Sequence, residues 1–178
     1  YLDFDAIPLT DESFFDAWDL SKGICVLDNN DNVVTDLRVN HSIRSPTAKY
    51  FNCHAMLVDG GYHPANDVIN TGIIGANAEH IKKLDYFGGF EHIIELMSAL
   101  RSDAYAETGM YPQNIIDMFR YDNETIFSYK LQVNNIDVQW LDDVWHYFFD
   151  RQRFIPAKTK IVHAICKDFD CVWRRLDA

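Results

Sequence analysis

The sequence predicts an α/β protein, and three observations support this fold class. Apolar residues recur with helical spacing in two segments, which indicates helices that pack one face against a core. Short apolar runs bounded by glycines or polar turns are typical of buried strands. The mixture of the two kinds of segment implies a sheet protein of the α/β or α+β kind. Because no repeat, low-complexity tract or linker divides the chain, residues 1–178 are expected to form a single domain.

The expected elements of the first part follow one another along the chain. Residues 1–5 are predicted to end a short buried strand. Residues 11–20 are predicted to form a helix, because Thr10 can cap it and acidic residues occupy its first turn. Two strands that flank a polar turn come next, at 23–27 and 33–37.

The middle and the end of the chain supply the remaining elements. Residues 50–58 and 68–76 are apolar stretches that suit strands near a ligand site. A pair of glycines then precedes a helix predicted over 90–100, and a second helix is predicted over 137–150. A final buried strand is expected at 159–165. The apolar positions of the second helix are Val138, Leu141, Val144, Trp145, Phe148 and Phe149.

Composition and charge limit the classes of function. Apolar residues make up 48% of the chain and charged residues 24%, which is ordinary for a folded soluble protein. The net charge of -11 argues against nucleic-acid binding, which needs clustered Lys and Arg. A small phosphorylated ligand stays compatible with this charge if a divalent cation supplies positive charge locally. No apolar run approaches the roughly 18 residues that span a bilayer, and no segment resembles a signal peptide, so we expect a cytoplasmic protein without a transmembrane segment.

Cysteine usage favours the same compartment. The four cysteines form no C-x-x-C pair and lack the spacing of zinc ligands, so reduced thiols are expected, with one disulfide left open. The four tryptophans are expected in the core or in a subunit contact, which leaves a homo-oligomer open.

Asp3 and Asp5 form the first candidate site. Side chains two positions apart share one face of a strand, and the chain leaves the predicted sheet here. Two carboxylates that converge at such a point can bind a hard divalent cation, and the cation can bridge diphosphate oxygens. A turn with two solvated acids is the simpler alternative.

Two later motifs add polar groups to apolar strands. Asn70, Thr71 and Gly72 interrupt one strand, where the glycine permits close approach of a backbone or ligand and its neighbours offer short hydrogen-bonding groups. His163 emerges from the last predicted strand as a possible neutral imidazole ligand, and Lys167 follows it as a point charge suited to phosphate. Each motif alone is equally compatible with a strand bulge or a structural histidine.

Taken in order, the segments YLDFDAI, NTGIIGAN and IVHAICK resemble motifs of the A-type-fold glycosyltransferases, especially the glycogenin and bacterial lipopolysaccharide galactosyltransferase group. That family has a hydrophobic-L-D-x-D motif, then F-N-[TA]-G, and near its end [VI]-H-F-x-G-x-x-K. The resemblance runs from Asp5 to Lys167. The chain departs from the pattern at Ile69, where the family has Phe, and lacks the family glycine after the histidine.

The resemblance implies the mixed-sheet fold of nucleotide-diphospho-sugar transferases, here without the nucleoside-binding strands that precede D-x-D in the family. It implies that Asp3, Asp5 and His163 bind Mn²⁺ or Mg²⁺. The substrates implied are a nucleotide-sugar donor, with UDP as the expected nucleotide, and a carbohydrate or glycoconjugate acceptor. The residues that would bind the donor are Asp3, Asn70, Thr71, Gly72 and Lys167.

The family also places an acid or amide pair at a helix start between the second and third motifs, and Asp142 and Asp143 are the catalytic candidates here. In a helix over 137–150, Asp142 lies at the edge of the apolar arc and Asp143 points away from it, so Asp142 is better placed to face a cleft. Acids in a first turn also favour the helix dipole without any catalytic role. An Asp142 acting as base on the acceptor would invert the anomeric configuration, whereas the family group retains it, so the stereochemistry is left open.

Two other classes of function stay open. A phosphohydrolase of the haloacid dehalogenase type also begins with D-x-D after an apolar strand, with the first Asp as nucleophile and the second as general acid. That family continues with [GST]-[TV], whereas this chain continues with Ala6 and Ile7. The other alternative is a non-catalytic sheet domain used for assembly.

Overall fold

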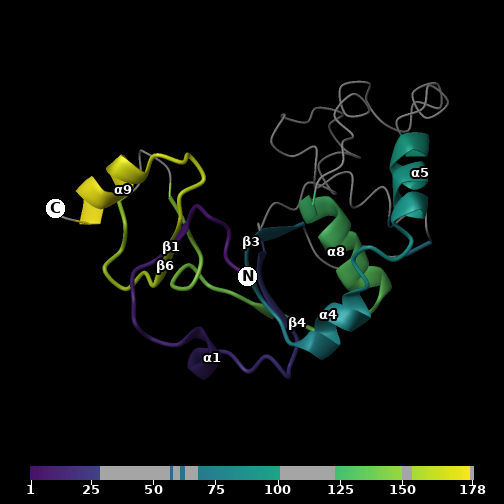
Figure 1. Cartoon of the computed structure of the whole chain (residues 1–178), viewed down its shortest axis with the longest axis horizontal. Coiled ribbons are helices and arrows are strands. Elements are labelled where there is room, and N and C mark those ends of the chain that lie inside the picture. The colour runs from purple at the N-terminus through teal and green to yellow at the C-terminus, as the bar shows by residue number, and fades with distance from the viewer. Residues whose placement is uncertain (29–56, 58–60, 63–67, 101–122, 150–153, 177–178) are drawn as a thin grey trace, which may run out of the picture. The chain divides into compact units, whose positions relative to one another are not determined.

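The computed structural model describes residues 1–28, 57, 61–62, 68–100, 123–149 and 154–176 (Figure 1). The chain groups into two compact units. The first unit consists of Tyr1–Leu27, Asn70–His80 and Asp137–Ala178, and the second of Asp28–Ile69 and Ile81–Ile136. The expectation of a single domain stays a prediction.

A small mixed sheet in the first unit joins an early strand to a late one. Strand β1 (Ala6–Pro8) pairs antiparallel with β6 (Ile161–His163), and Figure 1 shows the two side by side. In this register Ala6 lies opposite His163. Strand β5 (Tyr147–Phe148) runs parallel to the other edge of β6. The central strand of this sheet therefore carries the histidine that the sequence singled out.

The second sheet has the strand order β3-β2-β4. It consists of β3 (Ile69–Gly75), β2 (Ile24–Asp28) and β4 (Val138–Trp140), and β2 runs parallel to β4. β2 is buried along most of its length, as expected for a central strand. Two small sheets combined with helices confirm the predicted mixed α/β class.

The D-x-D motif connects these two sheets. Leu2 forms an isolated antiparallel bridge with Ile73 of β3, and the Asp3 N–H donates to the Gly72 carbonyl at 2.8 Å. The chain then turns over the next two residues and enters β1. The prediction that residues 1–5 end a buried strand is therefore wrong, because this segment makes a single bridge and the regular strand follows the motif.

One apolar cluster spans both sheets of the first unit. Fully burying a large side chain contributes about 1.5–3 kcal/mol, so this cluster stabilises the packing of the two sheets. Its members come from β1, β2, β3 and β6 and from the segment after β4. They are Ala6, Cys25, Leu27, Ile73, Leu141, Trp145 and Ile161.

Helix α1 (Phe14–Ala17) is a single turn, shorter than the helix predicted over 11–20. It buries no residue completely, and its N-cap Ser13 makes no side-chain capping bond, so little stabilises a longer helix. Phe14 anchors it by packing edge to face on Trp145, with ring centroids 5.4 Å apart.

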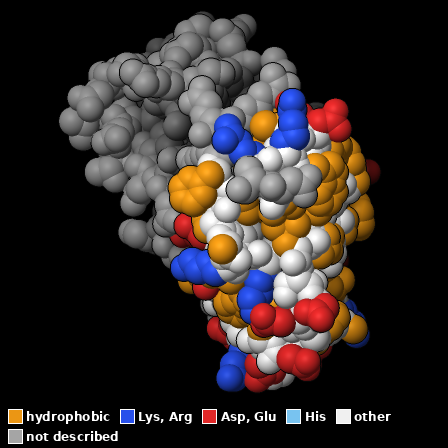
Figure 2. Space-filling view, turned by 90° about the vertical axis from the view of Figure 1, so that its left-hand side faces the viewer, with side chains coloured by type: hydrophobic (Ala, Val, Ile, Leu, Met, Phe, Trp, Pro, Cys, Tyr) orange, Lys and Arg blue, Asp and Glu red, His pale blue; other side chains and the backbone are white. Residues whose placement is uncertain are grey.

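Helix α9 (Phe169–Leu176) was not predicted, and it packs on the first unit through Val172. Val172 belongs to a second apolar cluster with Phe149, Val162 and Ala164. The side of the molecule where α9 lies faces the viewer in Figure 2, and hydrophobic side chains gather there between acidic and basic ones. Trp173 of α9 is one of the exposed hydrophobic residues.

The helix predicted over 137–150 is wrong, because the structure has β4, a turn and β5 in this segment. β4 pairs with β2, and the Gln139 side chain donates to the Asp19 carbonyl at 2.8 Å. The segment is rich in aromatic and β-branched residues, which fit a pleated surface well. Its apolar positions satisfied the helical pattern, but strand pairing determines the structure.

Helices form most of the regular structure in the described part of the second unit. Helix α5 (Phe90–Leu100) was predicted, whereas α4 (Ala78–Leu84), which begins in the first unit, and α8 (Asn123–Val133) were not. α8 is buried over much of its length and carries buried polar groups. One of them, the Ser128 hydroxyl, accepts the Ile69 N–H at 2.9 Å.

Four predicted elements are confirmed, namely β2, β3, α5 and β6. The strand expected at 33–37 lies outside the described residues, as does the one at 50–58 apart from residue 57. None of the helices formed by the described residues is both long and apolar enough to span a bilayer.

Candidate metal centre

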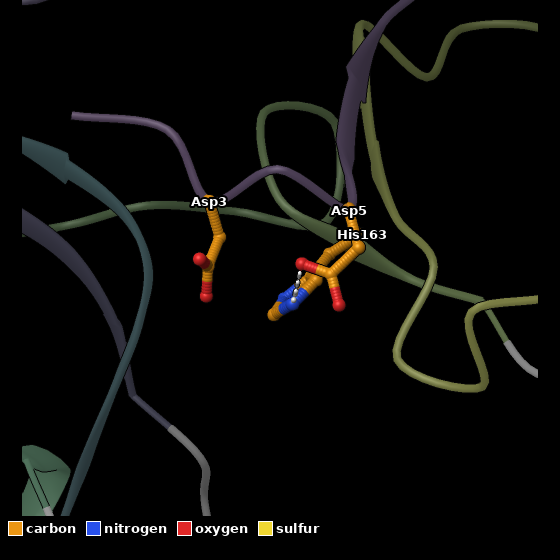
Figure 3. A group of neighbouring side chains, drawn as sticks. All are labelled: Asp3, Asp5 and His163. Carbon is orange, nitrogen blue, oxygen red and sulfur yellow. Dashed lines mark ion pairs between the residues drawn. The ribbon is translucent and has the colours of Figure 1, made fainter.

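Asp3, Asp5 and His163 come together in the first unit (Figure 3). One ligand atom from each side chain lies within 4.8 Å of the others. In Figure 3 the two carboxylates and the imidazole point to the same side of the chain, with His163 close to Asp5. The structure therefore brings together the three residues predicted as metal ligands.

Backbone hydrogen bonds on both sides of the motif place these side chains. The Asp3 N–H donates to the Gly72 carbonyl at 2.8 Å, which ties the first carboxylate to β3. The Asp5 carbonyl accepts the Ala164 N–H at 2.8 Å, which ties the second carboxylate to the end of β6. The two aspartates are thus fixed by different sheets, and their side chains meet where the D-x-D motif passes from one sheet to the other.

Asp5 and His163 form the buried part of the cluster, with exposed fractions of 4% and 6%. Asp5 Oδ1 lies 3.4 Å from His163 Nε2, the contact dashed in Figure 3. This contact lacks hydrogen-bond geometry, so Oδ1 is a buried carboxylate oxygen with no hydrogen-bond partner among the described residues. Leaving such a group without a partner is costly.

Burial lowers the pKa of His163, although the nearby charges of Asp5 and Asp3 oppose this effect. The neutral imidazole is the form that binds a metal ion. Two carboxylates and one neutral imidazole suit a divalent cation with oxygen and nitrogen ligands, and such a cation would supply the partner that Asp5 Oδ1 lacks. The three side chains could therefore hold a divalent cation.

The glycine of the Asn-Thr-Gly motif lies against the imidazole. A Cβ atom on Gly72 would lie 2.3 Å from His163 Cε1 and 2.6 Å from its Nδ1. Asn70 Oδ1 accepts the Gly72 N–H at 2.9 Å. Because side chains alternate along a strand, Asn70 lies on the same face of β3 as Gly72, and Thr71 points to the opposite face. The sequence predicted that a backbone or ligand approaches this glycine closely, and the group that does so is the His163 imidazole.

Lys167 lies beside the motif on the exposed side. Its Nζ is 5.0 Å from the centroid of the Phe4 ring, and Phe4 stands between the two aspartates. Lys167 N–H donates to the Ala164 carbonyl at 2.7 Å, which closes the turn after β6. The ammonium group therefore lies over the exposed Phe4 ring and is open to solvent.

Asp142 and Asp143 are exposed in the turn between β4 and β5. Asp142 Oδ1 accepts the backbone N–H groups of Val144 and Trp145 at 3.0 and 3.1 Å, so its carboxylate caps this turn. Neither aspartate belongs to the acidic and histidine cluster found among the described residues. The helix used to assign their orientation is absent.

His146 is a residue of this site that the sequence did not reveal. It is completely buried, and its Nε2 lies 3.0 Å from His163 Nδ1. Burial and the neighbouring His163 lower the pKa of His146 to about 3, so it is neutral at physiological pH. Its role depends on the pairing of β5 with β6, and a single histidine in a predicted helix gave no sign of that pairing.

Comparison with known proteins adds no relative to this picture, because no protein-family model, no curated protein and no solved structure matches the chain.

Proposed function

We propose that Asp3, Asp5 and His163 bind Mn²⁺ or Mg²⁺, and that the protein is a metal-dependent glycosyltransferase of the A-type fold. The observation that carries the proposal is the meeting of these three side chains around a buried carboxylate oxygen with no hydrogen-bond partner among the described residues. The D-x-D motif and the late strand that carries His163 contribute these ligands, which are the residues that the resemblance to this family implies, although the motif lies in a turn and not at a strand end.

The surrounding residues suit a nucleotide-diphosphate sugar as donor, with UDP as the nucleotide. A divalent cation supplies charge neutralisation to a departing diphosphate. Lys167 offers a second positive charge four residues after His163, where its ammonium group lies over the Phe4 ring of the D-x-D motif. Asn70 presents a short amide on the face of β3 that adjoins His163, where it can orient the sugar toward an acceptor hydroxyl of a carbohydrate or glycoconjugate.

The test is a calorimetric titration of the whole chain with Mn²⁺, followed by UDP in the presence and absence of Mn²⁺. We expect Mn²⁺ binding by the wild type and UDP binding that requires Mn²⁺. Asp5→Asn should abolish both, because it removes a ligand charge and keeps the side-chain shape. Asp16→Asn is the matched control, since Asp16 is exposed on α1 outside the cluster.

The outcomes separate the classes of function. If Mn²⁺ does not bind, the metal centre is refuted. If Mn²⁺ binds but UDP does not, the transferase proposal fails. Metal-dependent release of phosphate from p-nitrophenyl phosphate that is lost in Asp3→Asn would instead indicate the phosphohydrolase.

A further inference from the structure

A second imidazole lies directly behind the first in the metal centre. His146 Nε2 is 3.0 Å from His163 Nδ1, and both rings are buried. The ring centroids are 5.2 Å apart, and Phe148 packs on both rings at 5.1 and 5.5 Å. The backbone N–H of His146 donates to the Asp142 carbonyl at 2.9 Å. The capped turn before β5 therefore positions the residue that carries this imidazole.

The contact between the two rings restricts the position of their protons. One of the two nitrogens at 3.0 Å must carry the hydrogen and the other must accept it. His163 Nε2 faces Asp5. If Nε2 carries a proton, His163 Nδ1 has a free lone pair and accepts the ring Nε2–H of His146. If Nε2 is a metal ligand, its lone pair must be free, so Nδ1 carries the proton and donates it to His146 Nε2.

We propose that His146 is a positioning residue of the metal centre, which accepts the Nδ1–H of His163 and so holds the Nε2 lone pair of His163 toward Asp3 and Asp5. In the cation-bound state both rings are then protonated at Nδ1, whereas in the cation-free state both are protonated at Nε2. Each ring keeps one proton throughout, so the exchange of tautomers releases none. This inference rests on the proposed metal centre.

Packing around the His163 ring restricts its movement. The main feature of this ligand that can change is therefore which ring nitrogen carries the proton. Gly72 lies against its Cε1 and Nδ1 edge, and Phe148 packs on the ring. His146 Nδ1 is buried without a hydrogen-bond partner among the described residues. This nitrogen lacks a hydrogen bond whether it carries a proton or a lone pair, so the cation on His163 Nε2 selects the tautomer of the pair. His146 thereby influences both the geometry and the affinity of the site.

The first experiment measures the free Mn²⁺ signal by electron paramagnetic resonance as the whole chain is titrated. Second-coordination-sphere partners of a metal-bound histidine typically change affinity by about ten- to a hundredfold, so His146→Phe should weaken Mn²⁺ binding by roughly that factor. His146→Gln should restore most of the affinity, because its amide oxygen lies as many bonds from Cβ as the lost Nε2. His92→Phe is the matched control, since His92 is exposed on α5 in the second unit.

The second experiment reads the tautomers directly from the ¹⁵N chemical shifts of the histidine rings, with and without diamagnetic Mg²⁺. We expect His163 and His146 to change together from Nε2–H to Nδ1–H. This measurement uses the wild type, so it decides the question even if His146→Phe fails to fold.

The results distinguish this inference from the proposed function. A wild type that does not bind Mn²⁺ refutes the metal centre and this inference with it. A wild type that binds Mn²⁺, combined with equal binding by folded His146→Phe or with unchanged tautomers in Mg²⁺, refutes only the positioning role of His146.

Discussion

Gly72 leaves room for the imidazole of His163 because it has no side chain. The His163 ring occupies the space that a Cβ atom on residue 72 would need, and the Gly72 carbonyl accepts the Asp3 N–H. Gly72 therefore holds Asp3 by a backbone hydrogen bond, and its lack of a Cβ atom lets the His163 ring lie against it. At the residue scale, the candidate centre depends on this glycine as well as on its charged groups.

We expect Gly72→Ala to displace the His163 ring, because the added Cβ would lie 2.3 Å from Cε1. Overpacking of this kind costs about 1–3 kcal/mol of unfolding free energy, and Mn²⁺ affinity should fall at least about tenfold. Denaturant unfolding and Mn²⁺ titration measure the two effects. Gly75→Ala is the control in the same strand, because its Cβ would meet the Phe14 ring at 2.6 Å and should cost stability while leaving Mn²⁺ affinity unchanged. Equal loss of affinity in both variants would contradict the role of Gly72.

Cys25 provides a second prediction at this scale. It is completely buried in β2, and burial raises the pKa of its thiol to about 11. The thiolate is the reactive form, so at pH 8 the Cys25 thiol should stay protonated and react slowly with iodoacetamide. Cys166 and Cys171, which are free and half-buried, should be alkylated before Cys25. Mass spectrometry of the native protein over time reads the order, and simultaneous labelling of all three would contradict it.

At the scale of elements, the apolar pattern predicts those segments that are largely apolar runs or that carry one apolar stripe with helical spacing. β2, β3, β6 and α5 satisfy this condition and were predicted from the sequence. α8 did not satisfy it, because Glu124, Ser128 and Lys130 are buried with its apolar residues. The segment 137–150 fitted a helix by its spacing, but its pairing with β2 and β6 depends on distant residues that no local pattern contains.

The same difference explains how much of the candidate site could be predicted. Asp3, Asp5 and His163 lie in motifs with a family resemblance, and the structure brings them together. His146 has no such motif, and it meets His163 only because β5 pairs with β6. The orientation assigned to Asp142 failed with the helix on which it depended.

Asp142 can now be tested as a turn cap. Asp142→Ala removes the acceptor of two backbone N–H groups and should lower the unfolding free energy by about 1 kcal/mol. Asp142→Asn keeps an oxygen acceptor at the same position and should keep the stability. Asp143→Ala should change the stability by less than about 0.5 kcal/mol, since Asp143 is exposed. Urea unfolding of the three variants decides the matter, and equal stability of Asp142→Ala and wild type would refute the cap.

At the scale of the whole molecule, the first unit is assembled from three separate segments of the chain. Its mixed sheet pairs β1 with β6, and its core combines residues from both sheets. Contacts between residues so distant in sequence form slowly, because the chain must close large loops before it gains any contact energy. The candidate centre is therefore a property of the folded unit and of no single segment.

We expect Mn²⁺ to stabilise the whole chain against heat, because a ligand that binds only the folded state adds RT ln(1 + [L]/Kd) to its stability. At a Mn²⁺ concentration about a hundred times Kd this gain is about 2.7 kcal/mol. Differential scanning calorimetry with and without Mn²⁺ measures the shift in Tm. Asp5→Asn should show no shift, whereas Asp16→Asn should behave like the wild type. A wild-type Tm that does not respond to Mn²⁺ would count against the centre.

Because the D-x-D turn lies early in the chain and His163 late, the candidate centre should tolerate changes in the length of the chain between them. A cation held by Asp5 and His163 would act as a reversible cross-link that closes a loop containing the entire second unit. The entropy of closing a flexible loop grows only with the logarithm of its length, so each doubling costs only about 0.6 kcal/mol. Insertions and deletions within Asp28–Ile69 or Ile81–Ile136 should therefore be tolerated by the centre, provided that β3 and β4 stay in register with β2.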